Sequence, residues 1–236
     1  MQHDYHLCVI NGREVESSLL QDYKNIYQHW HSVWSQTFKE VSGSGMLFSD
    51  NFTRQDEIVA VMKDGKCISA VCHRLFDFRT TAPRNDSYFE SWPEDAFNQL
   101  GKNGPTIVIA GQLSVDPEYR KTHSGIRMSE LTTYLSLGRL QHLPISGISI
   151  AARNSRGMDS LFRVYQPETL REAITLHGEP TSLFGLYPKT MSSTGVPEAI
   201  RALGDELWAN AIMSKFLHPI FKTNVQGENY VNKTAA

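Results

Sequence analysis

The sequence predicts an α/β fold in which helices flank a central mixed, twisted sheet. Three observations lead to this fold class. Residues 107–140 read as a buried strand, a short turn and an amphipathic helix. Residues 58–78 read as two strands joined at Asp64-Gly65, and Asp-Gly is the strongest short hairpin signal. Strand and helix patterns also follow one another from residue 5 to residue 188, which is typical of a sheet covered by helices.

The first elements in chain order are a strand, a long helix and the hairpin. Residues 5–11 are predicted to form the first strand. Apolar residues then recur at three- and four-residue steps, which predicts an amphipathic helix. They are Leu19, Tyr23, Ile26, Trp30, Val33 and Phe38. This helix should end at the flexible Ser-Gly-Ser-Gly segment, residues 42–45. Residues 58–62 and 67–78 are the predicted strands of the hairpin.

The middle of the chain carries the most informative pattern. Residues 79–104 are polar and rich in turn residues, with a short helix predicted over 94–100. The strand over 107–115 is apolar and β-branched, and Asp116-Pro117 should end it because proline cannot donate to a sheet ladder. The helix that follows has Ser124 as its predicted N-cap. Its apolar stripe consists of Leu131, Tyr134, Leu135 and Leu140.

The last part of the chain completes the sheet and adds a final helix. The predicted elements are a strand over 145–152, a short helix over 155–165, a strand over 184–187 and a helix over 197–216 with proline at its start. The segment from Thr223 onward is polar. We therefore expect a single domain over residues 1–222 and a polar tail over 223–236.

Composition and charge exclude several function classes. The chain has 236 residues, of which 40% are hydrophobic and 20% charged, and its net charge is -2. Such a charge argues against a general nucleic-acid binder. No apolar run is long enough to span a bilayer, and the N-terminus has no secretory signal pattern. The three cysteines cannot all pair, so reduced thiols and a cytoplasmic location are expected.

Basic residues crowd the turn between the strand and helix of the 107–140 segment. They are Arg120, Lys121, His123 and Arg127. A helix N-terminus offers free backbone N–H groups and the positive end of the helix dipole, so this turn is suited to hold phosphate. The alternative is that these side chains are ordinary solvated surface charges.

The same stretch resembles the coenzyme-A loop of the GNAT superfamily of N-acetyltransferases. The resemblance rests on Leu-Ser-Val-Asp-Pro-Glu-Tyr-Arg at residues 113–120, followed by Gly125 and Ile126 of the glycine-containing turn. Arg127 stands where the family has a second small residue. The resemblance implies a GNAT-like acyl-CoA N-acyltransferase fold, with a splay between the strand ending at Val115 and the strand 145–152.

The resemblance also implies residues that bind the acyl donor. Leu113, Ser114 and Val115 would pair with its pantetheine arm. The loop 120–127 would hold its phosphates, and the residues concerned are Arg120, Lys121, His123, Ser124, Gly125, Ile126 and Arg127. Asn154 matches a family asparagine that follows the next strand. A β-branched residue at Gly125 should obstruct the donor and weaken its binding.

The resemblance suggests two catalytic residues. Gln112 stands where the family often has a glutamate base, and an amide cannot act as a base but could orient the amine or a water. Tyr165 lies one helical turn beyond the family's tyrosine position, which Phe162 occupies, and is the candidate acid for the departing thiolate. The alternatives are a polar residue bonded within the sheet for Gln112 and core packing for Tyr165.

No Cys or Ser lies in a recognisable nucleophile pattern, so we expect the acyl group to pass directly from thioester to amine. No metal is expected, since His29 and His31 are two residues apart and point apart on a helix.

The segment 56–75 looks like the corresponding region of acyl-homoserine-lactone synthases and long-chain N-acyl amino acid synthases. Those relatives take acyl groups from acyl carrier protein, so the donor could be acyl-CoA or an acyl-phosphopantetheine on a carrier protein. Three functions remain open. They are acyl transfer to a small-molecule amine or amino acid, acetyl transfer to a protein or peptide amine, and a catalytically silent fold that binds a ligand or partner. The sequence does not determine the oligomeric state.

Overall fold

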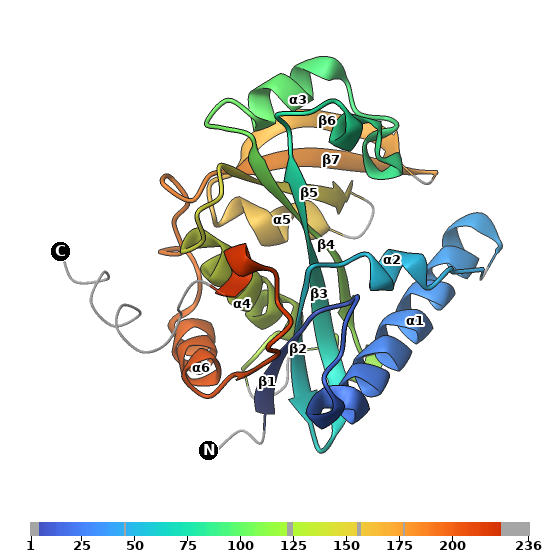
Figure 1. The fold of residues 1–236 in the computed structure, drawn as a ribbon, viewed down its shortest axis with the longest axis vertical. Helices are drawn as coiled ribbons and strands as arrows, with labels where there is room; N and C mark the ends of the chain where they lie inside the picture. Colours follow the sequence, from blue (N-terminus) through green and yellow to red (C-terminus); the bar gives the residue numbers. More distant parts are fainter. Residues whose placement is uncertain (1–4, 45, 122–124, 155–156, 177, 223–236) are drawn as a thin grey trace.

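One twisted sheet forms the centre of the molecule (Figure 1). The computed structural model describes residues 5–44, 46–121, 125–154, 157–176 and 178–222. Within these ranges eight strands pair in the order β6-β7-β5-β4-β3-β2-β1-β8. β1 pairs with β8, and β4 with β5, in parallel, whereas the other neighbours are antiparallel. The predicted mixed sheet flanked by helices is confirmed.

The element bounds agree with most of the expected ranges. The strands are β1 (Tyr5–Ile10), β2 (Glu57–Lys63), β3 (Lys66–Asp77), β4 (Thr106–Val115), β5 (Gly147–Arg153), β6 (Glu168–Leu176), β7 (Glu179–Leu186) and β8 (Ile212–Met213). The helices are α1 (Leu20–Ser42), α2 (Asp50–Thr53), α3 (Glu94–Leu100), α4 (Met128–Gln141), α5 (Met158–Arg163) and α6 (Glu198–Ala209).

The hairpin β2–β3 forms at the Asp-Gly signal. Asp64 and Gly65 have φ values of 50° and 73°, the left-handed conformations that a tight two-residue hairpin turn requires. β2 is buried on both faces except at its last residue, and the thiols of Cys67 and Cys72 in β3 are free and buried. The hairpin therefore lies in the middle of the sheet, where β3 serves as the partner of β4.

Helix α1 covers one face of β1, β2 and β3 (Figure 1). Ile26 and Trp30 are buried on its inner side, as the apolar spacing predicts. The helix ends at Gly43, whose φ of 75° is left-handed and whose N–H donates to the carbonyl of Lys39 at 3.1 Å. Helix α3 packs on the same face farther along the sheet, over β4 and β6.

Helices α4, α5 and α6 cover the opposite face of the sheet. Their apolar side chains join those of the sheet in the largest core cluster of the described residues. Gly204 on α6 permits close packing against α4, because a Cβ there would lie 2.4 Å from the ring of Tyr134. β4 and β5 are consequently enclosed between α1 and α3 on one side and α4 and α5 on the other.

Two expectations for the C-terminal part are wrong. The predicted helix over 197–216 ends at Ala209, because Ile212 and Met213 instead pair with Cys8 and Val9 of β1 and extend the sheet. The sequence pattern also predicts no strand over residues 168–176, although β6 forms there. β6 alternates poorly between apolar and polar residues because it is the edge strand and is largely exposed. The tail expected from Thr223 lies outside the described residues.

No helix in the part of the chain that the structure describes is both long enough and apolar enough to cross a membrane.

Candidate functional site

A cavity of about 360 Å³ opens where β4 and β5 separate. The two parallel strands pair only from Ile107 to Ile109 on β4 and from Gly147 to Ser149 on β5. Both strands continue well beyond these pairs, so their ends diverge. The predicted splay is confirmed.

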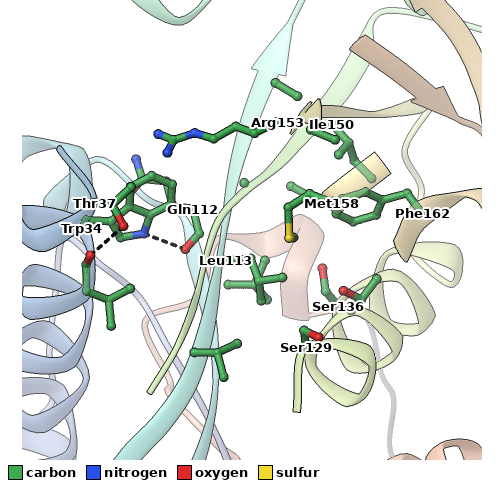
Figure 2. A pocket seen from close by; sticks show the side chains of 18 of the residues that line it. Trp34, Thr37, Gln112, Leu113, Ser129, Ser136, Ile150, Arg153, Met158 and Phe162 are labelled. Carbon is green, nitrogen blue, oxygen red and sulfur yellow. Dashed lines mark hydrogen bonds between the residues drawn. The ribbon is translucent and has the colours of Figure 1, made fainter. Parts of the chain in front are cut away.

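The cavity passes through the sheet and reaches both of its faces. Figure 2 shows Trp34 and Thr37 of α1 on one side of β4, and Ser136 of α4 with Met158 and Phe162 of α5 on the other. Two reagents could therefore approach the same strand edge from opposite sides of the sheet.

Much of the wall is apolar. Val71 of β3 and Ile150 of β5 contribute from the sheet, and Leu137, Met158 and Phe162 contribute from the helices. Polar side chains also line it, namely Thr37, Gln112, Arg120, Arg153 and the α4 hydroxyls of Ser129, Thr133 and Ser136. A mostly apolar cavity with placed polar groups is the usual form of a small-molecule site.

Gln112 lies at a bulge in β4, directly at the cavity. Its φ of 54° is left-handed, which is uncommon for a residue other than glycine, and the pairing with β3 shifts register at this point. The indole N–H of Trp30 donates to Gln112 Oε1 at 2.5 Å, and that of Trp34 donates to the Gln112 carbonyl at 3.2 Å. Because the oxygen of the side-chain amide accepts from Trp30, its NH₂ group is the end left to donate to a ligand.

Several of the residues expected to bind the donor or act on it do line the cavity. These are Gln112, Leu113, Val115 and Arg120. Arg120 is exposed, and its Nε donates to the carbonyl of Val115 at 3.2 Å. The guanidinium is thereby held against the end of β4, at the first residue of the predicted phosphate loop (120–127).

Other expected residues lie away from the cavity wall. The Ser114 side chain is buried on the α1 side, where its Oγ lies 3.1 Å from His29 Nε2. Ile126 is buried in the core, and Lys121 is exposed. Asn154 follows β5 and accepts a hydrogen bond from Ser182 Oγ at 2.9 Å. His123 and Ser124 lie outside the described residues.

The start of α4 differs from the prediction. The helix begins at Met128, with Arg127 as N-cap, rather than directly after Ser124. Gly125 has a φ of 80°, Ile126 is buried and Arg127 has extended backbone, so the chain is not helical there. A Cβ at Gly125 would meet nothing within 4 Å, so its left-handed φ, rather than crowding, is what favours glycine. Arg127 is exposed and paired with Glu130 at 3.2 Å.

Tyr165 is packed in the core and is not part of the cavity wall. Its side chain is 2% exposed, and burial raises the pKa of its phenol well above the usual range. Phe162, one turn earlier, occupies the wall instead. The geometry therefore gives the acid role of Tyr165 no support.

A buried polar cluster that the sequence reading missed lies beside the cavity. Glu57 of β2 bonds both His73 of β3 and Arg139 of α4, at 2.9 and 3.2 Å. His73 in turn lies 2.7 Å from Ser136 Oγ. Glu57, His73 and Arg139 are completely buried, whereas Ser136 lines the cavity. Their positions along the sequence form no local motif, so only the fold brings these residues together.

The burial of His29 gives a pH-dependent stability. Burial lowers the pKa of His29, and the positive charge of Arg120 lowers it further. The hydrogen bond with Ser114 and the negative charge of Asp116 raise it by less than burial lowers it. The unfolded chain then binds a proton more readily than the native protein, so stability falls as pH drops below about 6.5 and levels off below the folded-state pKa.

We expect His29→Gln to flatten this part of the pH profile. Urea unfolding of both proteins between about pH 8 and about pH 5 measures the effect, because most carboxylates titrate below that interval. If the free energy of unfolding changes with pH in the same way in the wild type and the variant, the prediction is contradicted.

Comparison with known proteins identifies the fold. No family model matches the sequence, and no curated protein matches it. Among solved structures, the acyl-homoserine-lactone synthase LasI is 16% identical with a TM-score of 0.52, over 81% of this chain and 94% of its own. BjaI, a CoA-dependent acyl-homoserine-lactone synthase solved with SAM and isopentyl-CoA, is 11% identical with a TM-score of 0.52, over 89% and 93%. FeeM, an N-acyl amino acid synthase from uncultured soil microbes, is 11% identical with a TM-score of 0.51, over 78% and 92%.

These similarities cover most of this chain and nearly all of each neighbour. The chain has the GNAT-type acyl-CoA N-acyltransferase fold, and the acyl-homoserine-lactone synthases are among its structural neighbours.

Proposed function

We propose that this protein is an N-acyltransferase that moves an acyl group from an acyl thioester to the amine of a small molecule or amino acid. The observation that carries the proposal is the cavity through the splay of β4 and β5 in a chain with this fold. A cavity that reaches both faces of the sheet can bring a donor and an acceptor to the same point, and such proximity lowers the barrier to acyl transfer.

The donor side is the open edge of β4. In the described residues β4 pairs with β5 only up to Ile109, and the edge beyond it is available to the amide groups of a pantetheine arm. The Arg120 guanidinium at the end of this edge suits the adjoining phosphates. Coenzyme A and a carrier-protein phosphopantetheine share this chemistry. The structural neighbour BjaI was solved with isopentyl-CoA, which supports a thioester of this kind.

The apolar wall suggests that the acyl group is longer than acetyl. Leu137, Ile150, Met158 and Phe162 lie on the α4 and α5 side of the cavity and offer an acyl chain a surface free of charge. Each buried methylene would contribute about 0.8 kcal/mol to binding. We expect affinity to rise with chain length until the cavity is full.

The acceptor side has a cationic group. The Arg153 guanidinium lies 5.2 Å from the centre of the Trp34 ring and 3.2 Å from Glu179, and it lines the cavity. A fixed cation beside an aromatic ring is suited to orient the carboxylate of an amino acid or related amine. The similarity in fold to the N-acyl amino acid synthase FeeM supports this acceptor class.

The experiment that tests the proposal combines binding and turnover. The melting temperature is measured with coenzyme A, acetyl-CoA and acyl-CoAs of increasing chain length, since a ligand of the native state raises it according to affinity. Thiol release is then measured with amino acids and with simple amines. Stabilisation followed by amine-dependent thiol release supports the proposal. Stabilisation without release by any amine would indicate a silent binding protein, and amide formation only on peptide amines would indicate the protein acetyltransferase.

Arg120→Ala should weaken the binding of phosphate-bearing donors. Removing one hydrogen bond to a charged group costs about 1.5–3 kcal/mol, which corresponds to roughly 10- to 100-fold in Kd. The loss should shrink at high salt, because ions screen the same interaction. Titration calorimetry of acyl-CoA and of the matching acyl-pantetheine measures the effect, with Lys189→Ala, an exposed lysine beyond β7, as control. Equal losses for both donors would contradict a phosphate contact.

A further inference from the structure

Helix α4 lines the cavity with hydroxyl groups. Ser129, Thr133 and Ser136 are four and three residues apart, a spacing that places them on one face of the helix. Figure 2 shows Ser129 and Ser136 on the same side of β4 as Phe162 of the apolar wall. An acyl chain bound along that wall therefore lies beside the hydroxyls of α4.

The hydroxyl of Thr133 is buried without a partner. Thr133 is 3% exposed, and its Oγ1 has no hydrogen-bond partner among the described residues. A threonine inside a helix can donate to the carbonyl four residues earlier. Thr132 does so to Met128 at 2.8 Å, and Thr37 of α1 does so to Val33 at 2.9 Å. Thr133 makes no such bond, and because an unpaired buried hydroxyl is costly, a polar atom of a ligand would satisfy it.

Ser136, one helical turn farther along α4, has its proton committed to the buried cluster. Its Oγ lies 2.7 Å from His73 Nε2, and His73 Nδ1 lies 2.9 Å from Glu57 Oε1. Glu57 is ionised in its pair with Arg139 and can only accept, so the proton of the neutral His73 ring lies on Nδ1. Nε2 is then an acceptor, and the Ser136 hydroxyl donates to it. The lone pairs of Ser136 Oγ remain to accept a hydrogen bond from a ligand.

We propose that Thr133 and Ser136 select an acyl chain that carries a hydroxyl group. A hydroxyl both accepts and donates, so its oxygen can accept from Thr133 while its hydrogen is donated to Ser136 Oγ. Residues three apart on a helix have Cβ atoms about 5–6 Å apart, so one ligand oxygen can reach both side chains. The inference deepens the proposed function and rests on it for the donor, an acyl thioester. Transfer from the thioester to the amine remains direct.

Other acyl chains satisfy this pair of hydroxyls less well. A plain chain covers Thr133 with methylene groups and leaves its hydroxyl unpaired. An oxo group accepts from Thr133 but has no proton to donate to Ser136. A site with placed polar groups discriminates against an analogue that lacks the matching group, because the polar groups of the site are then left unpaired. The expected order of affinity is therefore the hydroxylated chain first, the oxo chain second and the plain chain last.

Titration calorimetry of the full chain with acyl-CoAs of one chain length tests the proposal. The panel consists of octanoyl-CoA, its derivatives with a hydroxyl on the second, third or fourth carbon, and the matching oxo derivatives. We expect at least one hydroxylated chain to bind about 10-fold or more tightly than octanoyl-CoA, and more tightly than its oxo counterpart. This arm uses only the wild-type protein, so it does not depend on the folding of a variant.

Thr133→Val is the matched variant, because it keeps the shape of the side chain and removes the hydroxyl. It should bind octanoyl-CoA at least as tightly as the wild type does and should lose the preference for the hydroxylated chain. Ser136→Ala should lose part of this preference. Thr132→Val, next to Thr133 on α4 but outside the cavity wall, is the control and should keep it.

Three results would overturn the inference and leave the proposed function standing. Equal affinity for all chains of the panel would mean that Thr133 pairs with water only or stays unpaired. An oxo chain that binds as tightly as its hydroxylated counterpart would remove the acceptor role of Ser136. A Thr133→Val protein that binds every acyl-CoA more weakly by the same factor would place the hydroxyl against the donor arm. If no acyl-CoA binds and no amine releases thiol, the proposed function fails and this inference fails with it.

Discussion

Glu57→Ala is expected to lower the free energy of unfolding by about 3–5 kcal/mol, because it leaves the Arg139 guanidinium buried without its carboxylate. Both side chains are fully buried, and the carboxylate also bonds His73. An isolated charge in the core cannot recover its hydration, so the loss exceeds the net value of the pair itself. Urea unfolding monitored by tryptophan fluorescence measures the change.

Two controls make this prediction specific. Glu198→Ala removes one partner of an exposed pair with Arg201, and such pairs contribute at most about 1 kcal/mol. Replacing Glu57 and Arg139 together with methionine should cost less than Glu57→Ala alone, because no charge then remains unpaired. A loss below about 1 kcal/mol for Glu57→Ala would mean that the cluster is hydrated or that it rearranges when the carboxylate is removed.

Gly111→Phe should abolish donor binding, with a Kd at least about 100-fold higher than in the wild type. Gly111 lines the cavity on β4, and its φ is not left-handed, so the backbone accepts a side chain. The one heavy atom within 4 Å of a Cβ there is Ile109 Cγ2 at 3.7 Å, an ordinary contact. A benzyl group would therefore fill space that the ligand needs rather than disrupt the sheet.

The measurement is acyl-CoA titration of Gly111→Phe and Gly111→Ala, beside Ala202→Phe on the exposed side of α6 as a control that adds the same aromatic ring away from the cavity. We expect a graded loss, small for alanine and complete for phenylalanine, with no change for Ala202→Phe. Unchanged affinity of a folded Gly111→Phe protein would place the donor elsewhere.

The framework of the fold could be predicted from sequence because its signals are local. Asp64-Gly65 dictates the hairpin, Gly43 ends α1, and Asp116-Pro117 ends β4. The separation of β4 from β5 followed from the resemblance carried by residues 113–120. β8 could not be predicted, because its partner is β1 at the other end of the chain and its residues continue the apolar stripe of α6.

The site was only partly predictable for a related reason. Leu113, Val115 and Arg120 lie within the motif and line the cavity. Trp34 is on the same helix as the core residue Trp30, and sequence spacing alone does not distinguish a wall residue from a core residue. The cluster around His73 has partners 16 and 63 positions away, and such a pattern exists only after β2, β3 and α4 have packed.

The central claim is that the cavity between β4 and β5 holds the acyl donor. Photo-crosslinking with an acyl-CoA that carries a diazirine in its acyl chain tests it most directly. We predict that the label maps to the lining segments of β4, α4, β5 and α5, namely residues 110–115, 129–137, 150–153 and 158–162, and that unmodified acyl-CoA competes it away. A label that is competed by acyl-CoA but maps outside the cavity wall, or no competed label at all, would contradict the account.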